Sequence, residues 1–198
     1  MIIENTSDKI VNRMIANEII SDDDRAIYSY HLQVILETVV GHAILLTLAA
    51  LAGHFIEVAL FLLSFNILRS STSGYHCKTN TGCILLSAFS CALVVALENS
   101  AMNNILLFQW CGVLSMMFLL FVGAINHPNM GWSDEELKAA KKSSRTKILI
   151  LLILLPILDN LGIEKLYLYS FVMGIVQCAI SLLIVKLGKG GQNNEANS

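Results

Sequence analysis

Two stretches of the chain, 105–125 and 166–185, contain no charged residue. Each has about 20 residues, the length of α-helix that crosses the hydrocarbon core of a bilayer. The whole chain is 55% apolar and 14% charged, whereas an average soluble domain carries about 25% charge. A soluble core of 198 residues could not enclose this much apolar surface, so lipid must be the solvent for much of it.

The remaining apolar stretches are shorter or carry isolated polar groups, and they lie at 27–51, 55–68, 82–97 and 148–163. The sequence therefore predicts an all-α integral membrane protein with about six hydrophobic helical segments. The stretch at 27–51 is expected to begin at a capping box formed by Ser21 and Asp24.

Three parts follow from this pattern. Residues 1–20 place Ile3, Ile10 and Met14 at helical spacing with charged residues between them, which predicts an amphipathic N-terminal helix in the membrane interface. Residues 21–187 form a polytopic membrane domain with polar loops near 69–82 and 126–147. The polar tail at 188–198 is expected to be disordered.

Lysine and arginine are distributed very unevenly about these segments. If all six stretches cross the membrane and the N-terminus is cytoplasmic, every Lys and Arg except Lys165 lies on the cytoplasmic side. Positively charged loops are retained in the cytoplasm, so the pattern predicts an even number of crossings with both termini inside. The net charge of −2 gives no case for nucleic acid as a partner.

The first loop and the apolar stretch that follows it hold groups suited to nucleophilic chemistry. Cys83 is expected in or near the first turn of the helix at 82–97, where the helix N-terminus stabilises a thiolate. His76 lies seven residues earlier on a loop that contains glycine, so it can fold back toward the sulfur. A thiol beside a base is the arrangement that acyl transfer requires.

Two other interpretations of this loop stay open on the residues alone. The His and Cys side chains could be incidental in a polar loop. His76, Cys77 and Cys83 could also bind zinc, although they lack the paired short spacings of structural zinc sites.

The second loop combines a turn with a charged helix. Pro128 and Gly131 mark the turn, and Ser133 with Glu136 forms a capping box for a short helix that is acidic at its start and basic at its end. The basic end is interpreted as an anchor to anionic headgroups, and His127 as a structural or solvated residue.

The run from Arg69 through Gly74, Tyr75 and His76 to Cys83 resembles the signature of the accessory gene regulator protein B family. Members of that family are bacterial membrane cysteine endopeptidases that process quorum-sensing peptide precursors. The similarity extends over nearly the whole chain and includes the His-Pro-Asn turn and lysine-rich helix of the second loop. One departure is Ser73, because the family commonly has two glycines before the aromatic residue and the histidine.

The resemblance implies that Cys83 is the nucleophile and His76 its base, with Arg69 and Gly74 in supporting roles. It implies that the enzyme removes the C-terminal segment of the precursor through an acyl-enzyme, after which a Cys or Ser of the precursor closes a thiolactone or lactone ring. It implies no metal and no organic cofactor. The expected partners are a short amphipathic precursor peptide and the lipid bilayer of the bacterial cytoplasmic membrane, and the resemblance also allows a homodimer.

A third catalytic residue is not identified by the sequence; Glu37, Glu57 and Asn66 are the candidates for orienting the base. The competing hypothesis is a small membrane transporter or peptide-binding protein, in which Glu37, His42, Glu57 and Glu98 line a polar path. Such a protein would tolerate Cys83→Ala.

The charge distribution generates a prediction about topology. A reporter inserted at Ser143 should be cytoplasmic, and one inserted at Asn99 or Gly162 should be external, because this orientation places every Lys and Arg except Lys165 on the cytoplasmic side. Labelling of a cysteine introduced at Ser143 by an impermeant reagent in intact cells would contradict this orientation.

Overall fold

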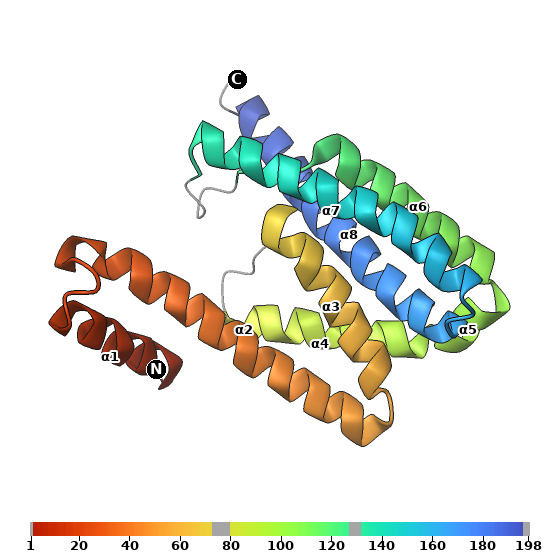
Figure 1. Cartoon of the computed structure of the whole chain (residues 1–198), viewed down its shortest axis with the longest axis horizontal. Coiled ribbons are helices and arrows are strands. Elements are labelled where there is room, and N and C mark those ends of the chain that lie inside the picture. The colour runs from red at the N-terminus through yellow and green to blue at the C-terminus, as the bar shows by residue number, and fades with distance from the viewer. Residues whose placement is uncertain (1, 73–79, 127–131, 196–198) are drawn as a thin grey trace. The chain divides into compact units, whose positions relative to one another are not determined.

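Every described element of the chain is a helix (Figure 1). The computed structural model describes residues 2–72, 80–126 and 132–195. The elements are α1 (Ile2–Ala16), a short 3-10 turn (Asp22–Asp24), α2 (Arg25–Ala52), α3 (Phe55–Thr72), α4 (Asn80–Ala96), α5 (Glu98–Asn103), α6 (Ile105–Val122), α7 (Asp134–Asn160) and α8 (Lys165–Glu195). The predicted all-α class is confirmed.

Four of the described helices are long and apolar enough to cross a membrane. They are Asp22–Ala52, Phe55–Thr72, Ile105–Val122 and Lys165–Leu187. The helix at Gly82–Ala96 is apolar but shorter, and α7 joins a charged half to an apolar half. Six crossings therefore stay a prediction.

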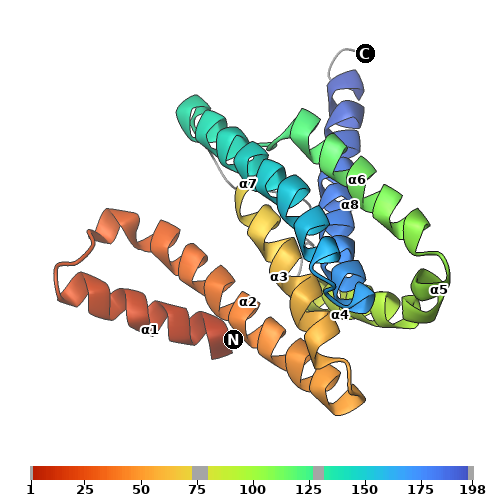
Figure 2. The same ribbon diagram turned by 45° about the vertical axis from the view of Figure 1, so that its right-hand side comes forward.

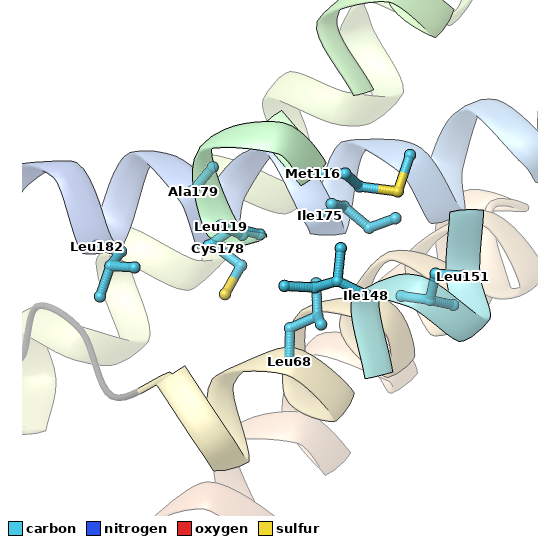
Figure 3. Packing of buried hydrophobic residues seen from close by; sticks show 9 residues of the cluster. All are labelled: Leu68, Met116, Leu119, Ile148, Leu151, Ile175, Cys178, Ala179 and Leu182. Atoms are coloured by element: carbon cyan, nitrogen blue, oxygen red, sulfur yellow. The ribbon is translucent and has the colours of Figure 1, made fainter. Parts of the chain in front are cut away.

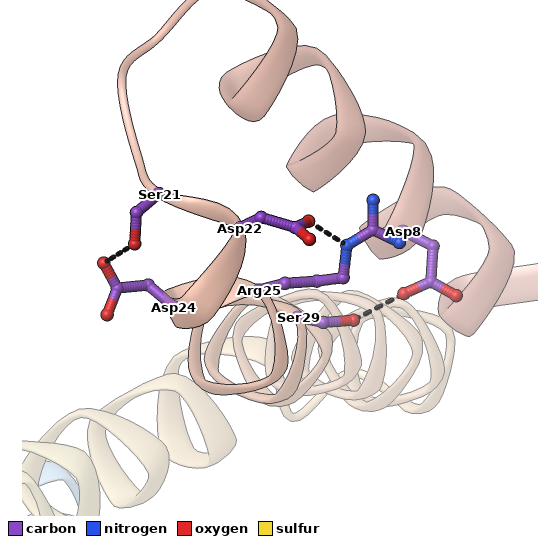
Figure 4. A network of polar contacts seen from close by, with 6 residues as sticks. All are labelled: Asp8, Ser21, Asp22, Asp24, Arg25 and Ser29. Atoms are coloured by element: carbon purple, nitrogen blue, oxygen red, sulfur yellow. Dashed lines mark hydrogen bonds and ion pairs between the residues drawn. The ribbon is translucent and has the colours of Figure 1, made fainter.

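The chain divides into two compact units, residues 1–48 and 49–198. In the first unit, Ser29 donates a hydrogen bond to the Asp8 carboxylate and so links α2 to α1 (Figure 4). The capping box predicted at the start of α2 is wrong, because Ser21 makes no side-chain hydrogen bond to the backbone there. The hydroxyl of Ser21 donates to Asp24 Oδ2 at 2.7 Å, while Arg25 pairs with Asp22 at 3.1 Å (Figure 4).

The second capping box is confirmed. Ser133 Oγ accepts from the backbone N–H of Glu136, and the Glu136 carboxylate accepts from the backbone N–H of Ser133 at 2.8 Å. Donation by this N–H and by the Ser133 hydroxyl lowers the pKa of Glu136. The short loop helix expected here is not separate from the apolar stretch at 148–163. The two form the single helix α7, because no glycine or proline interrupts residues 134–155.

The second unit is built around α8. In both views α8 lies alongside α3, α6 and α7 (Figure 1 and Figure 2). Their shared core is a cluster of buried apolar side chains (Figure 3), made of Leu68, Met116, Leu119, Ile148, Leu151, Ile175, Cys178, Ala179 and Leu182. The helix α8 continues to Glu195 and so includes part of the polar tail; disorder of residues 188–198 stays a prediction.

The helices α8 and α3 approach each other closely at Gly174. A Cβ atom added at Gly174 would collide with Ser64 Oγ and the backbone carbonyl oxygen of Phe61, and would lie 2.9 Å from the backbone nitrogen of Phe65. Small residues at helix crossings allow such backbone contact in membrane proteins. Glycine at 174 is therefore required for the observed packing of α8 on α3.

Pairs of contacting residues give the directions of the helices. Gly174 faces Ser64, and seven residues later Ser181 bonds to Arg69, so α8 runs parallel to α3. The end of α6 reaches the same end of the unit, because Ile125 donates its backbone N–H to the Thr72 carbonyl at 3.2 Å. We call this the Thr72 end, comprising residues 69–72, 80–83, 120–126, 133–147 and 181–187; the opposite end contains His54.

The crossing generates a stability prediction. Gly174→Ala should lower the unfolding free energy by at least the roughly 1–3 kcal/mol typical of an overpacked core, because the added methyl group meets backbone atoms that cannot move away. The measurement is the thermal melting temperature of the detergent-purified protein.

Gly112→Ala is the matched control. The three atoms nearest to its added Cβ all belong to the Val172 side chain, whereas those nearest to a Cβ at Gly174 include backbone atoms of α3. A Gly174→Ala protein that melts with the wild type, or that is more stable than Gly112→Ala, would show that the α3–α8 contact is not as close as described.

Candidate active site

Cys83 lies in the first turn of α4, three residues after its first residue Asn80, which confirms its predicted position at a helix start. Its side chain is half-buried. The first N–H groups of a helix have no partner within it, so negative charge on a group in this turn is stabilised. Gly74, His76 and Cys77 lie outside the described residues, and the contact expected between His76 and Cys83 is a prediction.

Arg69 brings a positive charge to this thiol. It lies in the last turn of α3, and its Nη1 donates to Ser181 Oγ of α8 at 2.8 Å. Its guanidinium carbon lies 5.9 Å from the centre of the Phe65 ring. The guanidinium interacts electrostatically with the thiol groups of Cys83 and Cys178. Arg69 is thus fixed by α8 and lies within electrostatic range of Cys83.

The two thiols near Arg69 differ in accessibility. Cys178 is fully buried in the core, and its sulfur lies 3.4 Å from the hydroxyl of Thr72, which is also fully buried. A thiol enclosed in this way behaves as a small apolar group. Cys83 is the more accessible thiol of the pair.

The last turn of α3 is held in place from α7. Lys147 Nζ donates to the carbonyl oxygen of Ile67 at 2.9 Å and to the hydroxyls of Ser70 and Ser71 at 2.8 and 3.2 Å. A cation at the C-terminal end of a helix complements the helix dipole. These bonds fix the point from which the chain enters residues 73–79.

The second loop belongs to the same end of the unit. Asn126 accepts from the backbone N–H of Trp132 at 3.2 Å and donates to its carbonyl oxygen at 2.7 Å. Arg145 Nε donates to the Leu120 carbonyl at 3.2 Å, and Ser144 donates to the Gly123 carbonyl at 3.3 Å, so α7 caps the end of α6. His127 lies outside the described residues.

The three candidates for an orienting residue are placed differently. Glu57 lies near the start of α3, twelve residues and about 18 Å along the helix from Arg69, so it is remote from the Thr72 end. Asn66 donates to the Leu62 carbonyl of its own helix at 2.6 Å. Glu37 belongs to the first unit, where it accepts from Gln33 at 2.8 Å.

Sequence reasoning missed Ser181, Thr72 and Lys147. Ser181 had a usable signal, because a hydroxyl inside a charge-free span usually faces another helix. The contact between Lys147 and the end of α3 joins residues about eighty positions apart, and no local pattern encodes it.

Comparison with known proteins gives one family and one distant relative. The sequence model of the family described as Accessory gene regulator B matches residues 7–184. A protein of Clostridium perfringens (strain SM101 / Type A), whose name describes it as AgrB-like, is 23% identical, and the alignment covers 92% of each chain. No solved structure matches the chain significantly.

The placement of Arg69 generates a prediction about thiol reactivity. Arg69→Gln should slow alkylation of Cys83 by iodoacetamide several-fold at neutral pH, because the substitution removes a positive charge that interacts with the reacting sulfur. The rate is measured on the Cys83 peptide by mass spectrometry. Lys186→Gln is the control, since it removes a positive charge at the same end from a side chain that lies over Phe121. Equal slowing in both variants would show that Arg69 has no specific effect.

Proposed function

Because the chain belongs to the accessory gene regulator B family, we propose that it is a membrane cysteine endopeptidase that removes the C-terminal segment of a quorum-sensing peptide precursor. The observation that carries the proposal is the position of Cys83, half-buried in the first turn of α4 and within electrostatic reach of the Arg69 guanidinium. The thiolate is the reactive form of cysteine, and both a helix N-terminus and a nearby cation attract negative charge.

The proposed reaction begins with transfer of the Cys83 thiol proton to His76. The thiolate attacks a backbone carbonyl carbon of the precursor, and the resulting oxyanion is stabilised by the positive end of the helix dipole at the first turn of α4. When the C–N bond breaks, His76 returns the proton to the leaving amine. The N-terminal part of the precursor is left on Cys83 as a thioester.

Ring closure transfers the acyl group from Cys83 to a side chain of the precursor. A Cys or Ser side chain within the precursor loses its proton to His76 and attacks the thioester carbonyl, and the Cys83 sulfur leaves with that proton. A thiolactone or lactone is released. Exchange of one thioester for another needs little driving force, so a thiol enzyme suits a thiolactone product. The scheme uses neither a metal nor an organic cofactor.

The charges at the Thr72 end indicate the side of the membrane from which the precursor would approach Cys83. Arg69, Arg145, Lys147 and Lys186 gather there, and in the proposed topology this end faces the cytoplasm with both termini. A short amphipathic precursor lying on the inner face of the cytoplasmic membrane would reach Cys83 from that side. A homodimer is compatible with the scheme, which needs only one chain.

The proposed dyad generates a prediction about activity. Cys83→Ala and His76→Ala should each reduce precursor cleavage by at least about 1000-fold without lowering the amount of protein in the membrane, and the double variant should be little worse than either single one. The measurement is the appearance of the free C-terminal segment when enzyme and precursor are reconstituted in vesicles.

Cys77→Ser is the matched control, and it separates thiol catalysis from zinc binding. If Cys77 has no part in the reaction, Cys77→Ser should keep most of the activity. If Cys77 binds zinc, it should be as essential as Cys83. Cleavage at the wild-type rate by Cys83→Ala would favour the transporter or peptide-binding hypothesis, and equal loss in Cys77→Ser and Cys83→Ser would favour a metal site.

A further inference from the structure

The opposite end of the second unit contains a cluster of ionisable groups that the proposed reaction does not use. His54 lies in the turn before α3, Glu57 in the first turn of α3, and Glu98 at the start of α5. One nitrogen or oxygen atom from each of the three side chains lies within 4.8 Å of the other two. His54 Nδ1 and Glu98 Oε2 are 3.4 Å apart.

Local structure explains how these side chains come together. Gly53 adopts a positive φ of 81°, and the backbone N–H of His54 bonds to the Ala49 carbonyl at 2.9 Å, which ends α2 directly before His54. Glu57 follows His54 by three residues at the start of α3, so both lie on one face. On the other side, Tyr169 of α8 donates to the Val94 carbonyl at 2.9 Å and fixes the end of α4 next to Glu98.

Glu98 lacks a partner for one of its oxygens. Its side chain is 12% exposed, and among the described residues no hydrogen-bond donor reaches the enclosed Oε1 atom. A buried carboxylate oxygen without a donor or cation is costly. Burial raises the pKa of Glu98, a shift that the nearby His54 opposes and the Glu57 charge reinforces. Within the described part of the chain, neither Glu57 nor Glu98 forms an ion pair with a lysine or arginine.

We propose that His54, Glu57 and Glu98 bind a divalent cation of the Zn²⁺ type, which fastens the start of α3 to the corner between α4 and α5. The geometry supports this: two ligands on one tetrahedral ion with bonds of about 2.0–2.1 Å are about 3.4 Å apart, the separation of His54 Nδ1 and Glu98 Oε2. An imidazole nitrogen and two carboxylate oxygens are ligands that Zn²⁺ accepts, and water would complete the coordination.

The charge balance also supports a cation. Two carboxylates with one divalent ion are neutral overall, which reduces the cost of placing them at the edge of the hydrocarbon region. The site contains no sulfur ligand, and it lies at the end of α3 remote from Cys83. The proposal is independent of the peptidase reaction and would stand if that reaction were disproved.

The test is an isothermal calorimetry titration of the purified full-length protein in detergent with ZnCl₂. We expect one high-affinity Zn²⁺ per chain. His54→Gln, Glu57→Gln and Glu98→Gln should each weaken its binding at least about tenfold, as loss of a metal-binding group does. Glu164→Gln is the matched control, because it makes the same charge change in an exposed residue near the start of α8 and should leave the affinity within about twofold of the wild type.

A second measurement identifies the ligands even if one variant misfolds. Co²⁺ bound in place of Zn²⁺ should give the absorption bands of a nitrogen and oxygen site without a thiolate charge-transfer band. Glu57 is half-exposed, so Glu57→Gln is the variant least disturbing to packing and decides the matter if Glu98→Gln fails to fold.

Three results would overturn the proposal. They are wild-type protein that binds no Zn²⁺; wild-type affinity in folded His54→Gln and Glu57→Gln; and a thiolate band with binding lost in Cys77→Ser.

Discussion

The close crossing of α3 and α8 is the contact on which the rest of the second unit depends. At Gly174 the two backbones approach too closely for any side chain. Further along the same crossing, Leu68, Ile175, Cys178 and Leu182 form part of the buried core (Figure 3). In lipid, helices gain little from apolar burial alone and associate through close packing and interhelical hydrogen bonds. The crossing supplies both.

The same contact sets the direction of the functional groups. Because α8 runs parallel to α3, Ser181 reaches Arg69 in the last turn of α3, and Arg69 acts on Cys83 at the start of α4. Lys147 binds that last turn from α7. The proposed nucleophile Cys83 and the nearby Arg69 thus lie at helix ends, and contacts from α7 and α8 fix the end that carries Arg69. The proposed base, His76, belongs to residues 73–79. The proposed cation site fixes the other end of α3 in the same way.

The sequence predicted those features that depend on local pattern. The all-α class, the Ser133 capping box and the position of Cys83 in the first turn of a helix all follow from neighbouring residues, and the structure confirms them. The continuity of α7 was missed because polarity changes at residue 148 while helix propensity does not. The partners of Arg69 and the grouping of His54 with Glu98 were missed because they join residues far apart in the chain. Such contacts depend on how the helices pack against one another, and the periodicity of the sequence carries no information about that packing.

The central claim, that Cys83 carries the acyl group, is tested most directly by trapping the acyl-enzyme. A precursor whose ring-forming Cys or Ser is replaced by Ala can be cleaved but cannot close the ring. The intact mass of the protein should then increase by the mass of the N-terminal part of the precursor, hydroxylamine should remove the adduct, and peptide mapping should place it on Cys83. Release of the C-terminal segment with no covalent adduct, or with an adduct on another residue, would contradict the account.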